Sequence, residues 1–263
     1  MMPRLTIILP FFNEEGWIGR TVASLTAQKD QRFRLLLVDN GSTDRGAEEA
    51  ALNTAPLGER ATILFCPTPG KIEALAAGLS HVETDLVATC DADTHYPPDY
   101  VRHVIALFDT DPSAAAVMAI DLYAAQDDPQ SRKRAAWIMH KSRRFQRKCH
   151  AGGYAQAFRT DALLAAGGFD TGRWPYVLED HEIVHRVMHH GRARYHADHV
   201  CFPSDRRASR KAVSWTRAER LLYRYTPATA LDWYFYRFLG PRLAARKSLG
   251  IALRQKDWSS AQA

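Results

Sequence analysis

The chain has 263 residues, of which 46% are hydrophobic and 24% charged, so it is long enough to bury a large core and is not a disordered chain. Its four scattered cysteines argue against a disulfide framework or a cysteine zinc site and fit a reducing compartment. No apolar stretch reaches the roughly 18 residues of a transmembrane helix, and the apolar run 5–12 leads into Asn13-Glu14-Glu15 without the cleavage site of a signal peptide.

The net charge of +6 is unevenly distributed along the chain. Residues 204–257 contain 13 Lys and Arg against 4 Asp and Glu, and residues 132–148 contain eight basic side chains and no acid. Such clusters favour anionic partners, whether lipid headgroups, nucleic acid or a phosphorylated substrate. A solvated helix face has the same composition, so both interpretations stay open.

The first part of the chain alternates between apolar strands and amphipathic helices. Strands are expected over 4–10, 33–38 and 62–66 and in a run that ends at Asp91, with helices over 15–28, from a Ser42-Thr43-Asp44 cap to about residue 53, and over 71–79. Apolar strands separated by helices predict an α/β fold with a mostly parallel sheet covered on both faces. Ligands of such sheets bind at the carboxyl ends of the strands, here 10–13, 39–42 and 91–93.

The second part continues the alternation and ends in a different kind of segment. The expected elements are helices over 98–109, 131–148, 160–166 and 179–190 and strands near 115–122 and 153–159. From residue 204 onward the sequence is helical in pattern, basic and aromatic. We therefore expect a nucleotide-binding and catalytic domain over 1–203 and a helical extension over 204–263.

Asp91-Ala92-Asp93 follows directly on the apolar run 86–90, so two carboxylates stand at the end of a strand. Mg²⁺ and Mn²⁺ prefer oxygen ligands, and Mg²⁺ is usually held by one or two carboxylates together with substrate phosphates. The pair thus predicts a site for a metal diphosphate. A simple acidic turn after a strand is the alternative for a motif this short.

Six sequence blocks, taken together, resemble a family 2 glycosyltransferase with the GT-A fold. They are residues 9–15 (LPFFNEE), 38–44 (VDNGSTD), 70–78 (GKIEALAAG), 91–93 (DAD), 167–170 (GGFD) and 179–182 (EDHE). The resemblance covers residues 4 to about 203 and implies a Rossmann-like sheet flanked by helices. The sequence departs from the commoner pattern at Asn40, where a second aspartate often stands. It also lacks the Gln-x-x-Arg-Trp block of processive synthases, so the resemblance does not extend to processive synthesis.

The resemblance also implies a donor, a metal and a set of donor-binding residues. The donor is expected to be a nucleotide-diphosphate sugar such as a UDP-sugar, with Mg²⁺ or Mn²⁺ held by Asp93 and Asp91. An apolar wall and a polar edge partner suit a nucleobase. The residues expected to bind the nucleotide are Pro10, Phe11, Asn13, Glu14, Asp39, Lys71 and Asp91.

Inverting sugar transfer needs one carboxylate that accepts a proton from the attacking hydroxyl. The resemblance assigns this base to the pair Glu179-Asp180, and we expect Asp180 to be the base and Glu179 to orient it or bind the acceptor. Acids at a helix N-terminus would also complement the helix dipole. Gly153 and Trp174 are expected to border the acceptor site. Arg206 and Arg207 are candidates for diphosphate contacts or for solvated surface.

Two alternatives compete with this interpretation. Residues 181–185 read His-Glu-Ile-Val-His, the H-E-x-x-H pattern that zinc hydrolases use. The basic, aromatic segment 221–239 resembles an interfacial amphipathic surface, so the tail is either a membrane-attachment module or packs on the core. Without a reader motif we expect no nucleic-acid partner. The favoured hypothesis is a cytoplasmic enzyme of cell-envelope glycan or glycolipid synthesis, with peripheral binding to the inner face of the membrane.

Overall fold

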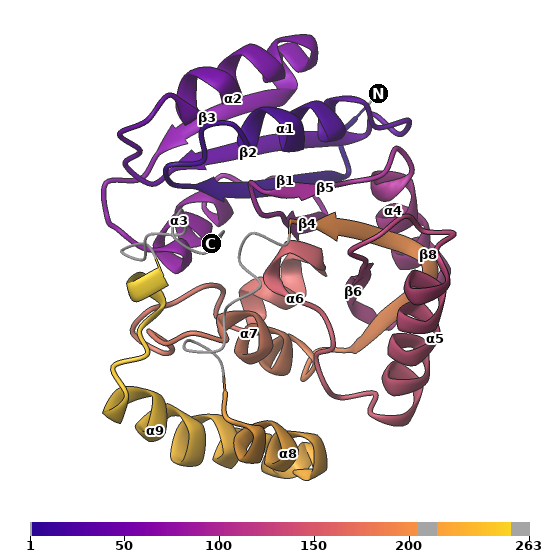
Figure 1. The fold of residues 1–263 in the computed structure, drawn as a ribbon, viewed down its shortest axis with the longest axis vertical. Coiled ribbons are helices and arrows are strands. Elements are labelled where there is room, and N and C mark those ends of the chain that lie inside the picture. The colour runs from indigo at the N-terminus through magenta and orange to yellow at the C-terminus, as the bar shows by residue number, and fades with distance from the viewer. Residues whose placement is uncertain (1, 205–214, 254–263) are drawn as a thin grey trace.

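A central mixed sheet organises the computed structural model, which describes residues 2–204 and 215–253 (Figure 1). Within these residues the eight strands lie in the order β3-β2-β1-β4-β7-β6-β8-β5. Their bounds are β1 Leu5–Phe11, β2 Phe33–Asp39, β3 Ala61–Phe65, β4 Leu86–Thr89, β5 Thr94–His95, β6 Ala114–Asp121, β7 Gln156–Arg159 and β8 Arg192–Pro203.

The parallel part of the sheet comprises β3, β2, β1 and β4, as the apolar runs predicted. β7 is antiparallel to both β4 and β6, β8 is parallel to β6, and the short β5 pairs antiparallel with β8. β1 and β4 are buried along their whole length, which explains why they read as continuous apolar runs rather than as alternating ones.

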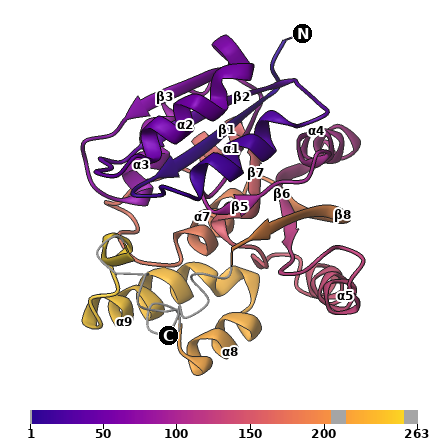
Figure 2. The same ribbon diagram turned by 45° about the horizontal axis from the view of Figure 1, so that its top comes forward.

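Helices cover both faces of this sheet. They are α1 Ile18–Thr26, α2 Gly46–Thr54, α3 Lys71–Leu79, α4 Tyr100–Thr110, α5 Pro129–Arg144, α6 Thr160–Ala165, α7 Glu179–Val187, α8 Arg217–Tyr225 and α9 Gly240–Ala245. Figures 1 and 2 show α1 and α2 on one side of β1–β3 and α3 on the other. The chain adds β2 and β3 on one side of β1 and then returns to add β4 on the other side of β1. Because each crossover between parallel strands is right-handed, the connecting helices of these two directions lie on opposite faces of the sheet.

Most expected elements are present, and the exceptions have local causes. The predicted cap of α2 is right in part: Asp44 Oδ1 accepts a hydrogen bond from the N–H of Gly46, the first residue of α2, at 2.9 Å. Ser42 Oγ and Asp44 Oδ2 instead accept from the backbone N–H groups of Asn13 (3.1 Å) and Glu15 (2.8 Å). α1 correspondingly begins at Ile18, not at residue 15. The strands β5 and β8 were not predicted.

The C-terminal part packs through a hydrophobic cluster of its own. Its buried members are Trp174, Val177, Trp215, Tyr223, Leu231, Tyr234, Phe235, Leu239 and Leu243. Figures 1 and 2 place α8 and α9 beyond α7, far from α1 and α2. Tyr223, Tyr234 and Phe235 therefore pack inward, whereas Leu221, Tyr225 and Trp233 remain exposed. In residues 2–204 and 215–253, no helix has the length and apolar character needed to cross a bilayer.

Candidate active site

The loops that follow β1 and β2 are tied to each other at the carboxyl edge of the sheet. The parallel register sets Phe11 beside Asp39, and the Asp39 carboxylate accepts a hydrogen bond from the Ser42 N–H at 2.8 Å. Asn13 has a left-handed φ of 52°, and its side-chain oxygen accepts from the Thr43 N–H at 2.8 Å. The expected nucleotide-binding blocks are thus neighbours in space, although the structure buries Phe11 in the core.

Pro10 and Glu14, also expected to bind the nucleotide, are buried at the same edge. The Glu14 carbonyl accepts hydrogen bonds from the N–H groups of Trp17 and Ile18, both at 3.0 Å, and so forms the turn that starts α1. Pro10 lies within β1, opposite Val38 of β2. Direct nucleotide contacts by these two residues stay a prediction.

Asn40 stands where the commoner family pattern has an aspartate, and its hydrogen bonds explain why an asparagine suits this position. Its amide nitrogen donates to the carbonyls of Cys66 (3.2 Å) and Thr68 (2.7 Å), and its amide oxygen accepts from the Gly70 N–H (2.7 Å). An ionised aspartate has no donor and cannot make the first two bonds. Asn40 thereby fixes the loop that leads to Lys71, the first residue of α3.

Lys71 forms an ion pair with the acidic turn after β4. Its Nζ lies 2.5 Å from Asp91 Oδ1, and the Asp91 side chain is only 10% exposed. Burial opposes the charge on Lys71, but Asp91, Glu179 and, less strongly, Asp180 outweigh this and raise the pKa of its ammonium. A group that favours its cationic form therefore lies beside the acidic turn and near the two acids that begin α7.

A buried tyrosine supports this acidic turn. The Tyr96 hydroxyl accepts from the Asp91 N–H at 3.0 Å and donates to the Tyr154 carbonyl at 2.9 Å. The Thr89 hydroxyl donates to the Gly153 carbonyl at 2.5 Å. The turn after β4 and the turn Gly153–Ala155 are consequently held together as one unit, a link between distant segments that sequence reasoning missed.

Asp93 lies where β5 meets the end of β8. Its carboxylate accepts from the Ser204 hydroxyl at 3.1 Å, and its carbonyl accepts from the Ser204 N–H at 3.0 Å. The side chain is largely buried, with an exposed fraction of 9%. The diphosphate candidates Arg206 and Arg207 follow directly in the sequence but lie outside the described residues.

Gly153 brings the second acidic pair close to Lys71. Its N–H donates to Asp180 Oδ2 at 3.2 Å, and a Cβ built on Gly153 would lie 3.4 Å from Lys71 Nζ and 3.5 Å from Asp180 Cβ. The other Asp180 oxygen lies 2.8 Å from both the N–H and Nδ1 of His181. A Cβ at position 153 would therefore be in ordinary van der Waals contact with both the lysine and the aspartate.

The surroundings of Glu179 and Asp180 shift the pKa values of these two carboxyl groups in opposite directions. Burial and repulsion from Asp180 raise the pKa of Glu179. Burial also acts against ionised Asp180, but the charge and hydrogen bonds of His181, with Lys71, outweigh it and hold the pKa of Asp180 below its usual value. Two adjacent acids with opposite shifts suit different roles, and Asp180 is the one that favours the ionised form, which the predicted base requires.

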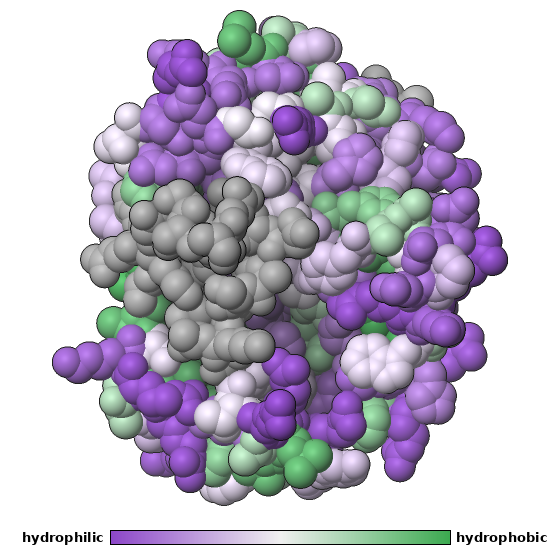
Figure 3. Space-filling view, in the orientation of Figure 1, coloured by the Kyte–Doolittle hydropathy of each residue, from purple (hydrophilic) through white to green (hydrophobic). Residues whose placement is uncertain are grey.

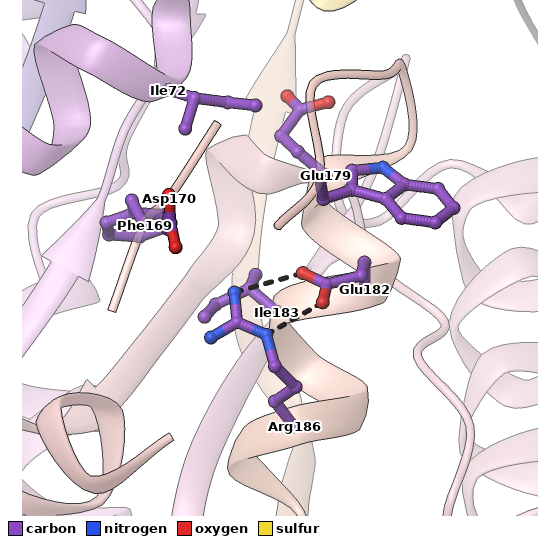
Figure 4. A pocket seen from close by; sticks show the side chains of 8 residues that line it. Ile72, Phe169, Asp170, Glu179, Glu182, Ile183 and Arg186 are labelled. Atoms are coloured by element: carbon purple, nitrogen blue, oxygen red, sulfur yellow. Dashed lines mark hydrogen bonds and ion pairs between the residues drawn. The ribbon is translucent and has the colours of Figure 1, made fainter. Parts of the chain in front are cut away.

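A small pocket extends from Glu179 along α7 (Figure 4). Its empty volume of about 190 Å³ includes open solvent, so the enclosed space is small. The Glu182–Arg186 ion pair forms part of its wall. Trp174 lines it too, but the indole is 2% exposed and donates to the Val177 carbonyl at 3.0 Å. Trp174 therefore shapes the loop before α7 and offers little surface to an acceptor.

The zinc-hydrolase interpretation of residues 181–185 is wrong. His181 binds Asp180, and its ring packs against Trp215. Glu182, which would have to be the base, is 1% exposed. Its carboxylate forms an ion pair with Arg186 and accepts a hydrogen bond from the Tyr236 hydroxyl at 2.5 Å. His185 instead faces Asp232, with His185 Nε2 2.7 Å from Asp232 Oδ1. His181, Glu182 and His185 have the spacing of the H-E-x-x-H motif on a helix, but each side chain bonds to a different partner.

Comparison with known proteins agrees with the fold and the sequence blocks. The model of the family "Glycosyl transferase family 2" matches residues 6–163. Two undecaprenyl-phosphate 4-deoxy-4-formamido-L-arabinose transferases are similar to this chain. That of Sodalis glossinidius is 36% identical over 107 residues, which are 39% of this chain and 32% of the relative. That of Edwardsiella ictaluri is 32% identical over 112 residues, 40% of this chain and 34% of the relative. The matches thus span about a third of these relatives.

Two solved structures share the fold over nearly the whole chain. One is the mannosyltransferase PcManGT from Pyrobaculum calidifontis in complex with GDP-Man and Mn²⁺, with a TM-score of 0.66, 21% identity and coverage of 94% of this chain and 74% of that one. The other is S. aureus TarS 1–349 in complex with UDP-GlcNAc, with a TM-score of 0.60, 17% identity and coverage of 96% and 76%. With the family model matching more than half of the sequence, the chain belongs to glycosyl transferase family 2 and has the GT-A fold.

Proposed function

We propose that the protein transfers a sugar, with inversion, from a nucleotide-diphosphate donor to a hydroxyl of a lipid-linked acceptor. The observation that carries this proposal is the convergence of Lys71, Asp91, Gly153 and Asp180 at the carboxyl edge of the sheet. A cation and an acidic turn suit a metal-bound diphosphate, and a separate ionised carboxylate suits an attacking hydroxyl. The fold shared with proteins solved with GDP-Man and UDP-GlcNAc supports this donor class.

The acidic turn has the donor set that a hard divalent cation prefers. Asp91 and Asp93 offer carboxylate oxygens two residues apart, and Lys71 already balances the charge of Asp91. We assign Asp93 as the main ligand for Mg²⁺ or Mn²⁺, with Asp91 beside it. When bound, the cation would stabilise the negative charge of the departing diphosphate. Lys71 adds a second positive charge on the same side.

Replacing Asp93 with alanine tests the donor half of the proposal. The ligand is the UDP- or GDP-sugar that the wild type hydrolyses best. We expect its Mn²⁺-dependent affinity to fall by at least about tenfold, because even changes to residues that only support metal ligands reduce metal affinity by that factor. Calorimetric titration at fixed Mn²⁺ measures this. Asp127→Ala, which removes an exposed carboxylate before α5, is the matched control. Unchanged donor affinity in Asp93→Ala, or no hydrolysis of any nucleotide sugar by the wild type, would contradict the proposal.

The lipid-linked acceptor is supported by a basic surface formed by α5 and α8. Burial and the nearby Arg224 and Arg220 of α8 lower the pKa of Lys141 of α5 to about 8, so like charges of the two helices converge there. Trp137 and Tyr225, 50% and 67% exposed, lie on the same two helices. Hydrophilic side chains predominate on the side of the molecule where α5 lies (Figure 3). Basic residues with exposed aromatics are typical of peripheral membrane surfaces.

The double variant Arg220→Gln/Arg224→Gln tests this surface without disturbing the buried aromatics, which a truncation of the tail would remove. Each basic residue near an anionic membrane contributes about 1 kcal/mol of binding free energy. We therefore expect the affinity for vesicles containing phosphatidylglycerol to fall about 30-fold when two are removed. Vesicle flotation measures it, and neutral vesicles show whether charge is responsible. Arg20→Gln/Arg102→Gln, on α1 and α4, changes the net charge equally and should bind nearly normally. Equal losses in both double variants would rule out a specific basic surface.

A further inference from the structure

A cluster of possible metal ligands lies on the side of α7 that the proposed reaction does not use. It consists of His185 and His189 of α7 and Asp232, which directly precedes the π-helical turn η5 (Trp233–Leu239). One ligand atom from each residue lies within 4.8 Å of the other two, and His185 Nε2 is 2.7 Å from Asp232 Oδ1. The cluster therefore connects the helix that carries Asp180 to the C-terminal part of the chain.

The geometry brings three possible ligands of a tetrahedral site close together. Residues four apart share one face of a helix, so the two imidazoles project together. The buried His185 ring stacks on Phe235 with centroids 5.2 Å apart and meets the His189 ring edge-on at 4.9 Å. Bonds of about 2.0–2.2 Å to nitrogen and oxygen place ligand atoms roughly 3.3 Å from each other. His189 and Asp232 are exposed, so small rotations of their side chains suffice to reach that spacing.

We propose that His185, His189 and Asp232 bind a divalent transition-metal ion, with Zn²⁺ as the best fit, and that this ion fastens the C-terminal part of the chain to α7. Two imidazoles and one carboxylate are a donor set that selects Zn²⁺, Ni²⁺ or Cu²⁺ over Mg²⁺. The oxygen donors Asp91 and Asp93 select hard cations instead, so the two sites discriminate between metals. Glu182, the residue that would be the base in an H-E-x-x-H enzyme, is bound to Arg186. We therefore assign the ion a structural role.

The test is a Zn²⁺ titration of the full chain in millimolar Mg²⁺, which occupies oxygen-only sites. Three proteins are compared: the wild type, His189→Ala and the matched control His190→Ala, which removes the adjacent exposed histidine. His189→Ala keeps the hydrogen bond between His185 and Asp232 and so isolates metal binding from simple packing. At a 100-fold excess of Zn²⁺ over its Kd, we expect Tm to rise by about 5–10 °C in the wild type and in His190→Ala. In His189→Ala the rise should be lost.

Co²⁺ provides a second readout, because tetrahedral Co²⁺ absorbs strongly in the visible range. One equivalent should produce this absorption in the wild type and in His190→Ala but not in His189→Ala. Equal Tm shifts in all three proteins, or the same spectrum in His189→Ala, would overturn the assignment and leave only a hydrogen bond between His185 and Asp232. Neither readout involves sugar transfer, so the outcome is independent of the proposed catalytic function.

Discussion

Asp180→Asn is expected to reduce sugar transfer by about 10²–10⁴-fold, the usual contribution of a positioned general base. The amide oxygen can still accept the hydrogen bond from the Gly153 N–H, but the amide nitrogen cannot accept from the His181 N–H as Asp180 Oδ1 does, and the side chain can no longer take a proton. Nucleotide affinity should stay nearly unchanged, because the donor is assigned to the other side of Lys71. Single-turnover transfer and calorimetric donor binding measure the two quantities separately.

Glu179→Gln is the matched control, since it neutralises the adjacent acid whose pKa is raised and which already favours the protonated form. It should lower transfer much less than Asp180→Asn does. If Asp180→Asn weakens donor binding as strongly as Asp93→Ala, the division of roles is wrong. If Asp180→Asn transfers at the wild-type rate, the acceptor needs no base, as for a lipid phosphate oxygen that is already ionised at neutral pH.

Arg186→Met is expected to destabilise the fold by about 3–5 kcal/mol, because it leaves the Glu182 carboxylate buried without its partner. The two side chains are 7% and 1% exposed, and Arg186 also donates to the carbonyls of Ala166 and Gly168. Two buried carbonyls thus lose their donors together with the ion pair. The free energy of unfolding from urea titration measures the effect.

Arg34→Met is the control for that measurement, because its partner Glu83 is 78% exposed and such surface pairs contribute about 0–1 kcal/mol. The double variant Glu182→Leu/Arg186→Met should recover part of the lost stability by removing the unpaired charge. A cost for Arg186→Met no greater than for Arg34→Met would show that the buried pair is not a major contributor to stability.

The parallel half of the fold was predictable mainly because three of its four strands are largely buried, whereas the edge strand β3 is partly exposed. β1, β2 and β4 read as apolar runs, and α3 was predicted with the bounds that the structure shows. β8 escaped prediction because polar residues such as His196 and Asp198 lie in exposed positions within it. β5 has two residues and exists only through its pairing with β8, which no local pattern reveals.

The residues of the candidate site were predictable where they lie close together in the sequence. They were not predictable where the site depends on contacts between distant segments. Asp91 and Asp93 are recognisable together, as are Glu179 and Asp180. The Tyr96 hydroxyl bonds to the carbonyl of Tyr154, 58 residues away, and no spacing rule gives such a contact. The H-E-x-x-H pattern failed for a related reason: spacing decides which residues share a helix face, but the packing of the whole chain decides what that face meets.

Trp174 and Val177 belong to the hydrophobic cluster built by the C-terminal segment, whereas Phe11, Ala92 and the strands that precede the other loops belong to the main core. The loop before α7 and the loops that follow β1 and β4 are therefore supported by separate hydrophobic clusters. Substitutions in the C-terminal segment can alter the packing of the loop before α7 without changing the core beneath the strands that were predicted to hold the nucleotide.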